Sequence, residues 1–357
     1  MHLQDTNFKD ETIYVGIDTH KKNWNVSLYH KETALQTFSQ AARTELLVTY
    51  LHKHYPGANY LCAYEAGFSG YWIQKSLVRQ GIQCIIVNPA DIPTTHKEKE
   101  FKSDPRDCRK IARCLRSNLL EAIYIPTDQG IEARHVVRLY HDMSKNYTRF
   151  KNKIKSVINF YGIDYPSEFH STNTHWSNKF YTWLKSLRLT SESGNWVLEI
   201  LIRECLKSKE LKNEATRKVR ELSKTSRYAN LVLLLRSIPS IGLITSMKIL
   251  TEIEDIKRFS NLDTLCSYIG LIPSTQSSGE KERIGEITNR GNKFLKGAII
   301  ESAWMAIRRD PSLLHKYLQL KSRMDGNKAI IRIARKLLAR IRFVLIHNKP
   351  YIMADHT

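Results

Sequence analysis

The first 125 residues alternate short apolar runs of strand length with runs of helical spacing, and this alternation restricts the fold more than any other feature. Residues 13–30 predict two strands around a polar turn, and residues 33–40 predict a third strand of an antiparallel meander. A helix near 43–54 should follow, and then the strand-like runs YLCAYEA and CIIVNP with a helix between them. The pattern predicts an α/β domain in which helices cover a mixed sheet.

Residues 130–235 differ, with few glycines, many basic residues and apolar positions at helical spacing, such as Val137, Tyr140 and Ile154. This spacing predicts long helices, arranged as a coiled-coil hairpin. The turn-rich segment GIDYPSEFHSTNTHW should join two of them. We therefore expect an α/β domain over residues 1–125, a helical connecting element over 126–235 and a mostly helical domain over 236–357.

The charge of the chain favours a polyanionic partner. Its 56 Lys and Arg residues against 35 Asp and Glu residues give a formal net charge of +21, so nucleic acid is the leading candidate. A basic surface that serves only solubility is the alternative, and neither a basic amphipathic helix nor a lipidation signal supports a membrane partner. Without a signal-peptide pattern or an apolar run of membrane-spanning length, we expect a cytoplasmic protein that joins the nucleoid when bound to DNA.

The six cysteines are scattered along the sequence and lack the close pairs of a zinc site or a disulfide framework. They are Cys62, Cys84, Cys108, Cys114, Cys205 and Cys266. We expect reduced, mostly buried side chains.

Two acidic residues end predicted strands. Asp18 closes VGID, and Glu65 closes LCAYE before the glycine-containing turn AGFSG. A carboxylate at a strand end can project into a site and hold a metal ion. The alternatives are a turn-forming role for Asp18 and a solvated loop position for Glu65.

Two further acids lie three positions apart at the start of a predicted helix. This spacing puts Asp104 and Asp107 on one helix face, within reach of a shared ion. Asp104 directly precedes Pro105, so a helix N-cap is the alternative for that residue. Hard cations such as magnesium prefer oxygen ligands, and two such ions suit phosphodiester chemistry. We expect the four acids to hold two magnesium ions, with manganese as the alternative metal.

The order GIDTHKKNWNV, YEAG and NPADIPTTHKEKEFKSDPRDCRKIAR resembles the N-terminal domain of insertion-sequence transposases with a RuvC-like Asp-Glu-Asp-Asp site, the insertion-sequence family one-hundred-ten and the Piv-type invertases. IPSIGLITSMKILTEI and RFSNLDTLCSYIGLIPSTQSSGEKERIGEITNRGN are similar to the C-terminal part of the same family. The resemblance implies a RuvC/RNase H-like first domain and makes Asp18, Glu65, Asp104 and Asp107 the catalytic, metal-binding acids.

The resemblance also implies a nucleophilic serine before Gly279, where this chain offers both Ser277 and Ser278. Family members with a single serine before glycine favour Ser278, and those with Ser-Thr-Gly favour Ser277. A serine hydroxyl needs an activating base or metal, so a composite site with the distant acids is chemically reasonable. From the residues alone, QSSGE is a polar turn.

The implied activity is that of a DNA recombinase, which cleaves and exchanges strands through a serine–DNA phosphodiester link. The implied partners are double-stranded DNA at the element ends and target, a guide RNA from the element itself, and further copies in a homodimer that assembles into a tetramer. Two alternatives remain: a Holliday-junction nuclease that uses water as nucleophile, and a non-catalytic nucleic-acid-binding scaffold.

Two other features predict nucleic-acid contacts. IPSIGLIT is typical of a helix-hairpin-helix turn, in which Gly242 allows a tight bend and backbone N–H groups meet a phosphate; an ordinary helix link is the alternative. Basic residues also recur on the predicted helices, where they could track phosphates or structured RNA, with solvated helix faces as the alternative. The two basic clusters are Arg149, Lys151, Lys153 and Lys155, and Arg332, Arg335, Lys336, Arg340 and Arg342.

Overall fold

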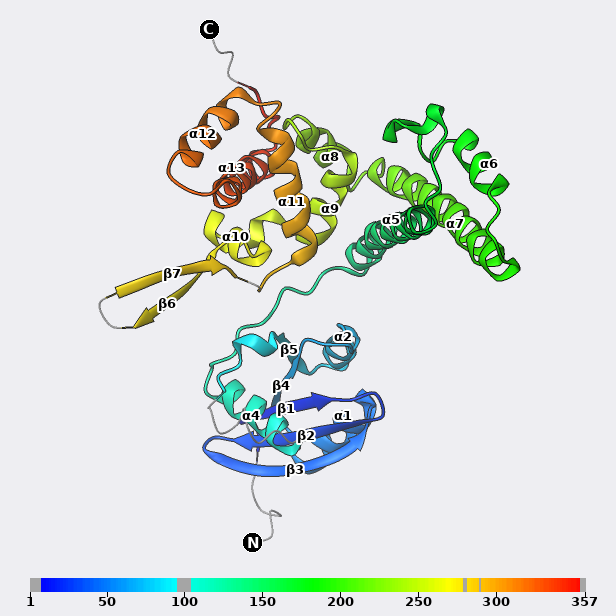
Figure 1. Ribbon diagram of the computed structural model, residues 1–357. Helices are drawn as coiled ribbons and strands as arrows, with labels where there is room; N and C mark the ends of the chain where they lie inside the picture. The colour runs from blue at the N-terminus through cyan, green and yellow to red at the C-terminus, as the bar shows by residue number, and fades with distance from the viewer. Residues whose placement is uncertain (1–7, 95–103, 279–280, 289, 354–357) are drawn as a thin grey trace. The chain divides into compact units, whose positions relative to one another are not determined.

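The computed structural model describes residues 8–94, 104–278, 281–288 and 290–353 (Figure 1), and leaves the side chains of 104, 274–278 and 281–286 undescribed. The chain divides into two compact units, residues 1–125 and 126–357, which are described here one at a time. Among the described residues, no helix is both long and apolar enough to cross a membrane.

The first unit contains a five-stranded sheet in the order β3-β2-β1-β4-β5. The first three strands pair antiparallel, while β4 runs parallel to β1 and β5 parallel to β4, so the mixed sheet expected from the sequence is confirmed. Helices α1, α2 and α4 cover it (Figure 1). The elements are β1 (Thr12–Thr19), β2 (Asn23–His30), β3 (Thr33–Ala41), α1 (Thr44–His54), β4 (Asn59–Glu65), α2 (Trp72–Arg79), β5 (Gln83–Val87), η2 (Pro89–Asp91) and α4 (Asp104–Arg116).

The two faces of this sheet bury different cores, because side chains alternate along each strand. Ile13, Val15 and Ile17 of β1 pack with Leu47 of α1 and Leu77 of α2 on one face. On the other face, small and apolar residues of the strands pack against α4: Ala63, Val87, Ile111, Cys114 and Leu115. Burial on both faces explains why the central strands are nearly continuous apolar runs.

Gly16 lets α4 rest directly on the backbone of β1. A Cβ atom built on this glycine would lie 2.1 Å from the backbone oxygen of Cys108 and 2.4 Å from the backbone nitrogen of Ala112. No other amino acid fits there without moving the helix, since contacts below 3 Å do not occur at real Cβ atoms. Gly16 thereby fixes the height of α4 above the sheet.

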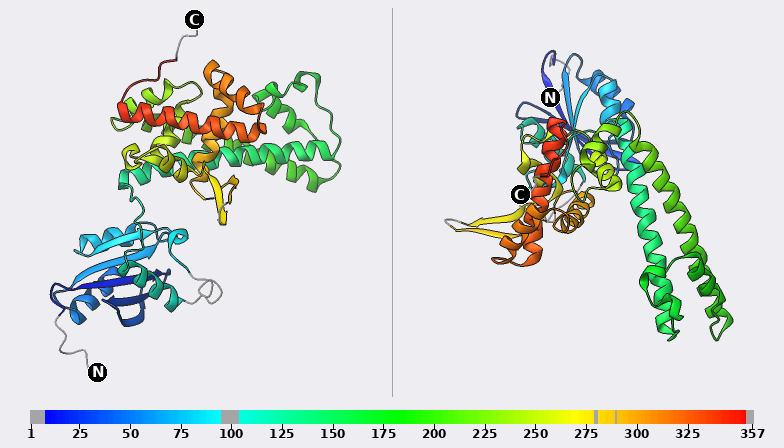
Figure 2. Two further views of the ribbon diagram at one scale, coloured as in Figure 1. Left: turned by 90° about the vertical axis from the view of Figure 1, so that its left-hand side faces the viewer. Right: turned by 90° about the horizontal axis from the view of Figure 1, so that it is seen from above.

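The second unit begins with a long helical hairpin. Helix α5 is 33 residues long and runs beside α7, as the two views of Figure 2 show. The apolar core at the far end of the hairpin includes the aromatic residues Tyr147, Phe169, Phe180 and Tyr181. The elements are α5 (Asp128–Phe160), η3 (Ser167–Phe169), η4 (Thr172–Thr174), α6 (Asn178–Ser186) and α7 (Glu192–Ser223).

The rest of the second unit is a helical bundle with one β-hairpin. Its core joins the first turns of α5, at Ala133 and Val137, to the end of α7, at Val219, and to the C-terminal helices. The hairpin was not expected from the sequence, because the polar run PSTQSSGEKERIGEI lacks the apolar alternation of a buried strand. The elements are α8 (Ala229–Arg236), α9 (Leu243–Ile253), η5 (Ile256–Arg258), α10 (Leu262–Ile269), β6 (Pro273–Ser278), β7 (Lys281–Ile287), α11 (Lys293–Ala306), α12 (Pro311–Lys321) and α13 (Gly326–His347).

Replacing Gly16 with alanine should destabilise the first unit, because the new methyl group must push α4 off the sheet. Overpacking of this kind costs about 1–3 kcal/mol. We expect a melting temperature lower by several degrees in calorimetry. Gly67→Ala is the matched control, since the nearest atom to a Cβ there is 4.0 Å away. Equal stability of the two variants would contradict the close-packing argument.

Candidate active site

Asp18 and Glu65 end neighbouring parallel strands. The register pairs Ile17 with Tyr64, so Asp18 and Glu65 are the next residues along β1 and β4. Alternation places Asp18 on the same face as Gly16, and Glu65 on the same face as Ala63, which is the face that α4 covers. The structure therefore brings these two acids together at one edge of the sheet.

Asp104 and Asp107 lie in the first turn of α4, the helix that rests on Gly16. Cys108, the next residue of the helix, packs on β1 two residues before Asp18, since its backbone oxygen would lie 2.1 Å from a Cβ atom on Gly16. Burial, and then the negative charge of Asp18, raise the pKa of the Cys108 thiol to about 11. The backbone of Asp104 is part of the helix, but its side chain is outside the described residues, so its N-cap role remains a prediction.

Two cationic or titratable groups contact the acids. The Nε2 atom of His20 lies 3.3 Å from Oδ2 of Asp18, and the Nζ atom of Lys110 lies 3.1 Å from Oδ1 of Asp107. Lys110 is the more enclosed cation, with 11% of its side chain exposed against 51% for His20. The sequence analysis did not single out Lys110, although its spacing of three residues from Asp107 on a helix predicts such an ion pair.

The candidate ligands are all carboxylates, which suit a hard cation. Carboxylate oxygens are the ligands that magnesium and manganese prefer, and acids from β1, β4 and α4 occupy one edge of the sheet. Among the described side chains, however, no three His, Cys, Asp or Glu residues already form a metal-binding cluster. The three described acids therefore fit in ligand type, while the set of four predicted from the sequence includes a side chain, that of Asp104, outside the description.

Ser277 and Ser278 belong to the second unit, where they are the last two residues of β6. Their backbone pairs with Glu282 and Lys281 of β7, and Gly279 with its neighbour lies outside the described residues. The two serines thus stand at the end of a hairpin arm rather than in a turn between helices.

The root of this hairpin is tightly packed. Gly270 and Gly291, both with positive φ, approach so closely that a Cβ on Gly291 would lie 2.5 Å from the nitrogen of Gly270. The N–H of Thr288 donates to the oxygen of Ile272 at 3.0 Å. These contacts fix where the two strands leave the helical bundle.

A buried carboxylate joins that root to α5. Glu252 of α9 is 1% exposed and accepts two hydrogen bonds from the guanidinium of Arg138, at 2.7 and 3.0 Å. It accepts a third, at 2.8 Å, from the side-chain amide of Asn292, which also caps the N-terminus of α11. The hydroxyl of Tyr268 donates to the backbone oxygen of Glu252 at 2.9 Å. The sequence analysis missed this network; an acid within the apolar helix LITSMKILTEI was the available signal.

The predicted helix-hairpin-helix turn requires one correction. The residue with positive φ between α8 and α9 is Ser240, at +79°, whereas Gly242 has an ordinary φ of −87° and is the N-cap of α9. Gly242 is therefore not the source of the bend. It does leave the start of α9 without a side-chain cap, and a Cβ placed there would meet open space.

The basic cluster of α13 is mostly engaged within the chain. Arg335 pairs with Asp263 at 2.6 Å, Arg340 pairs with the buried Asp310, and Arg342 donates to the backbone oxygen of Ser260 at 2.9 Å. Arg332 and Lys336 are exposed. Only part of this predicted cluster is therefore available to a phosphate backbone.

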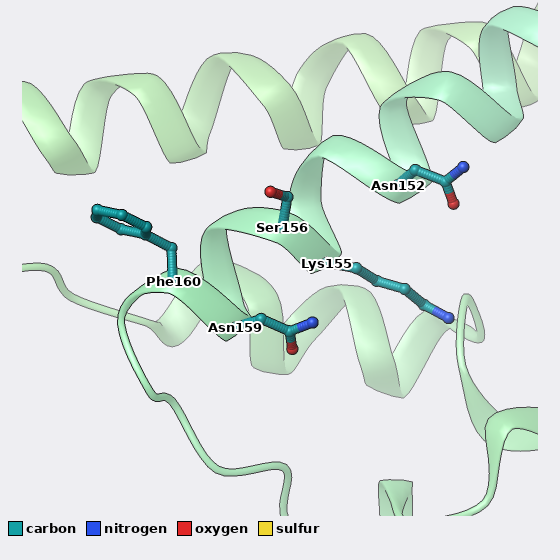
Figure 3. Close-up of a pocket in the computed structure, with 5 residues that line it drawn as sticks. All are labelled: Asn152, Lys155, Ser156, Asn159 and Phe160. Atoms are coloured by element: carbon teal, nitrogen blue, oxygen red, sulfur yellow. The ribbon is translucent and has the colours of Figure 1, made fainter.

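The basic cluster of α5 is more exposed. Arg149 and Lys153 face solvent, while the ammonium of Lys151 lies over the ring of Tyr147 at 5.0 Å. Figure 3 shows Lys155 beside a shallow pocket at the end of the helix, whose lining residues are Asn152, Lys155, Ser156, Asn159 and Phe160.

Comparison with known proteins finds two family models that match this chain. A model of DEDD-type transposases of the IS110 type, described as "Transposase", matches residues 15–163, and one described as "Transposase IS116/IS110/IS902 family" matches residues 232–319. The first contains Asp18, Glu65, Asp104 and Asp107, and the second contains Ser277 and Ser278. A DEDD-type transposase domain suggests dependence on a divalent metal.

Individual relatives are distant and cover much of the chain. It is 24% identical over 294 residues to the transposase of insertion sequence element IS1111A from Coxiella burnetii, a match covering 80% of this chain and 77% of that one. It is 23% identical over 264 residues to the transposase of element IS1533 from Leptospira borgpetersenii, covering 70% and 72%. A third match, 26% identical over 246 residues to protein y4qE of Sinorhizobium fredii, covers 69% of this chain and 58% of that relative, less than two thirds of its length.

Replacing Glu252 with alanine should destabilise the second unit strongly, because it leaves the Arg138 guanidinium and the Asn292 amide without their acceptor. Removing one partner of a buried ion pair costs about 3–5 kcal/mol. The measurement is thermal unfolding followed by circular dichroism. Glu221→Ala is the control, since its pair with Lys218 is exposed and should contribute little. A similar loss of stability in both variants would mean that the buried hydrogen-bond network of Glu252 contributes no more than an exposed ion pair.

Metal binding should depend on the acids of the first unit. With bound ions stabilising the folded state by mass action, millimolar Mn²⁺ or Mg²⁺ should raise the melting temperature of the native chain. The increase should be absent in the double variant Asp18→Asn, Glu65→Gln. Glu32→Gln is the control, because that acid lies in the turn between β2 and β3, at the opposite edge of the sheet from Asp18. An undiminished increase in the double variant would place the metal elsewhere.

Proposed function

Since this chain belongs to the IS110 family of transposases, we propose that it cuts and rejoins DNA during the movement of an insertion sequence. The observation that carries the proposal is the placement of Asp18 and Glu65 at adjacent strand ends, under a helix that begins with Asp104 and Asp107. The net charge of +21 supports a nucleic-acid substrate.

Asp18, Glu65, Asp104 and Asp107 would hold the divalent ions, magnesium or manganese. When bound, such ions supply charge stabilisation at the phosphate and lower the pKa of an attacking hydroxyl. The packing of the chain would fix the distance between these acids. Gly16 sets the separation of α4 from the sheet, and with it the separation of the acids of α4 from the acids at the strand ends. Lys110 and His20 would steady the carboxylates that they contact.

The nucleophile would be the hydroxyl of Ser278 or Ser277. Its Oγ forms a bond to phosphorus, the bond from phosphorus to one ester oxygen of the strand breaks, the serine proton passes to a base, and the leaving oxygen takes up a proton. Attack by a hydroxyl of a second strand reverses the step and releases the serine. One phosphodiester bond is replaced by another throughout, so strand exchange needs no external energy source.

This chemistry requires the serine hairpin to meet the acids, within one chain or between copies. A homodimer that assembles into a tetramer would supply such meetings between copies and would bring two DNA sites together. A guide RNA from the element would select those sites by base pairing. The exposed Arg149 and Lys153 of α5 support a nucleic-acid surface outside the catalytic centre.

The decisive test is to trap a covalent protein–DNA adduct. Labelled element-end DNA, magnesium and the copurified RNA are mixed with the protein, and adducts are resolved in denaturing gels. The double variant Ser277→Ala, Ser278→Ala should lose the adduct and strand exchange by at least about a hundredfold, and the single variants identify the nucleophile. Ser274→Ala, on the same strand, should behave as the native chain does.

The same assay separates the two alternatives. Cleavage without an adduct, undiminished in the double serine variant, would favour a nuclease that uses water. Strand cleavage that is undiminished in Asp18→Ala and Glu65→Ala, or missing from the native chain, would favour a nucleic-acid-binding scaffold.

A further inference from the structure

The turn that follows Glu65 is rigidly held. The N–H of Gly70 donates to the oxygen of Gly67 at 3.1 Å, and Gly70 has a positive φ of +55° that few other residues adopt. The hydroxyl of the buried Tyr64 donates to the oxygen of Gly70 at 3.0 Å. These bonds fix a tight turn over residues 67–70.

The same turn is tied to the strand that bears Asp18. Ser69 is 8% exposed, and its hydroxyl donates to Oγ1 of Thr19 at 3.1 Å. Thr19 is the residue after Asp18. The turn is therefore anchored beside both strand-end acids.

Phe68 is the exception within this anchored turn, because its side chain is 64% exposed. The neighbouring Ser69 is buried, while Trp72 is 50% exposed and has its ring centroid 5.8 Å from that of the buried Trp24. A large apolar ring held in water on a rigid turn loses little conformational entropy when a partner covers it. The turn thus presents a preorganised flat apolar surface.

The surroundings of Phe68 suit one class of partner. Lys21 and Lys22 are exposed in the turn that follows Thr19, at the same edge of the sheet. Lysines beside an exposed aromatic ring are the combination with which proteins hold an unpaired strand: the cations meet phosphates and the ring stacks on a base.

We propose that Phe68 stacks on an unpaired base of the DNA strand that Asp18 and Glu65 engage, beside the phosphate that is cut. The inference rests on the proposed function, since it takes the acids to mark the cutting position. Three residues of chain span at most about 11 Å, and successive bases of one strand are about 3.4 Å apart. The Cα atoms of Glu65 and Phe68 are therefore no farther apart than about three stacked bases, which puts the stacked base near the cut, and Phe68 favours sites whose bases open easily.

The test compares two DNA probes on the full-length chain. One is a fluorescein-labelled duplex with a three-base unpaired bubble, and the other is the same duplex fully paired. Phe68→Ala should weaken binding of the bubble about tenfold, as expected for the loss of one stacked base, and leave binding of the duplex unchanged. Phe68→Trp should retain native affinity for both. Leu119→Ala, which removes another exposed apolar side chain of the same unit, is the control.

A second measurement locates the contact directly. Bubble DNA with 5-iododeoxyuridine in place of an unpaired thymidine is irradiated with the native chain, and the crosslinked peptide is identified by mass spectrometry. Crosslinking to Phe68 supports the inference. Unchanged bubble affinity in Phe68→Ala, an equal loss in Leu119→Ala, or a crosslink that avoids the 67–70 turn overturns it. Neither measurement needs strand cleavage, so failure of the stacking inference and failure of the proposed chemistry give different results.

Discussion

The close contact between the backbones of β1 and α4 at Gly16 is the constraint on which the first unit depends. A single hydrogen in place of a side chain allows Cys108 and Ala112 to rest on the strand itself. The apolar residues Ile111, Cys114 and Leu115 can then reach Ala63 and Val87, and the acidic first turn of α4 stands over the ends of β1 and β4. The placement of the candidate acids is thus a consequence of helix–sheet packing, because the residues that hold the helix are apolar or small and are not themselves candidates for the chemistry.

Sequence patterns predicted the first unit well for a physical reason. Its central strands are apolar runs that end abruptly in Asp18 and Glu65, and such a change of polarity is visible without a structure. The pairing of the two acids depends on the parallel register of β1 and β4, which the sequence does not state. The sequence analysis predicted that the acids share a metal site, and the fold supplies the register that puts Asp18 and Glu65 at neighbouring strand ends.

The second unit was harder to predict because its decisive features are polar. The β6–β7 hairpin has no apolar alternation, and the bend at Ser240 occurs in a residue type that rarely adopts positive φ. Glu252 lies in a mostly apolar helix, and its partners are far away along the chain. Arg138 is 114 positions before it and Asn292 is 40 positions after it. The acid within an apolar helix is a local signal of a buried carboxylate, but nothing in the local sequence identifies its distant partners.

The hairpin of α5 and α7 has a core of its own at the far end, where Tyr147, Phe180 and Tyr181 are buried together. An arm that is packed at both ends resists bending and keeps its length. A helix of 33 residues is about 50 Å long, which equals roughly 15 base pairs of a DNA duplex. The α5–α7 arm can therefore set a fixed spacing. A nucleic-acid segment bound at its tip is held more than one helical turn of DNA away from a segment bound at the start of α5.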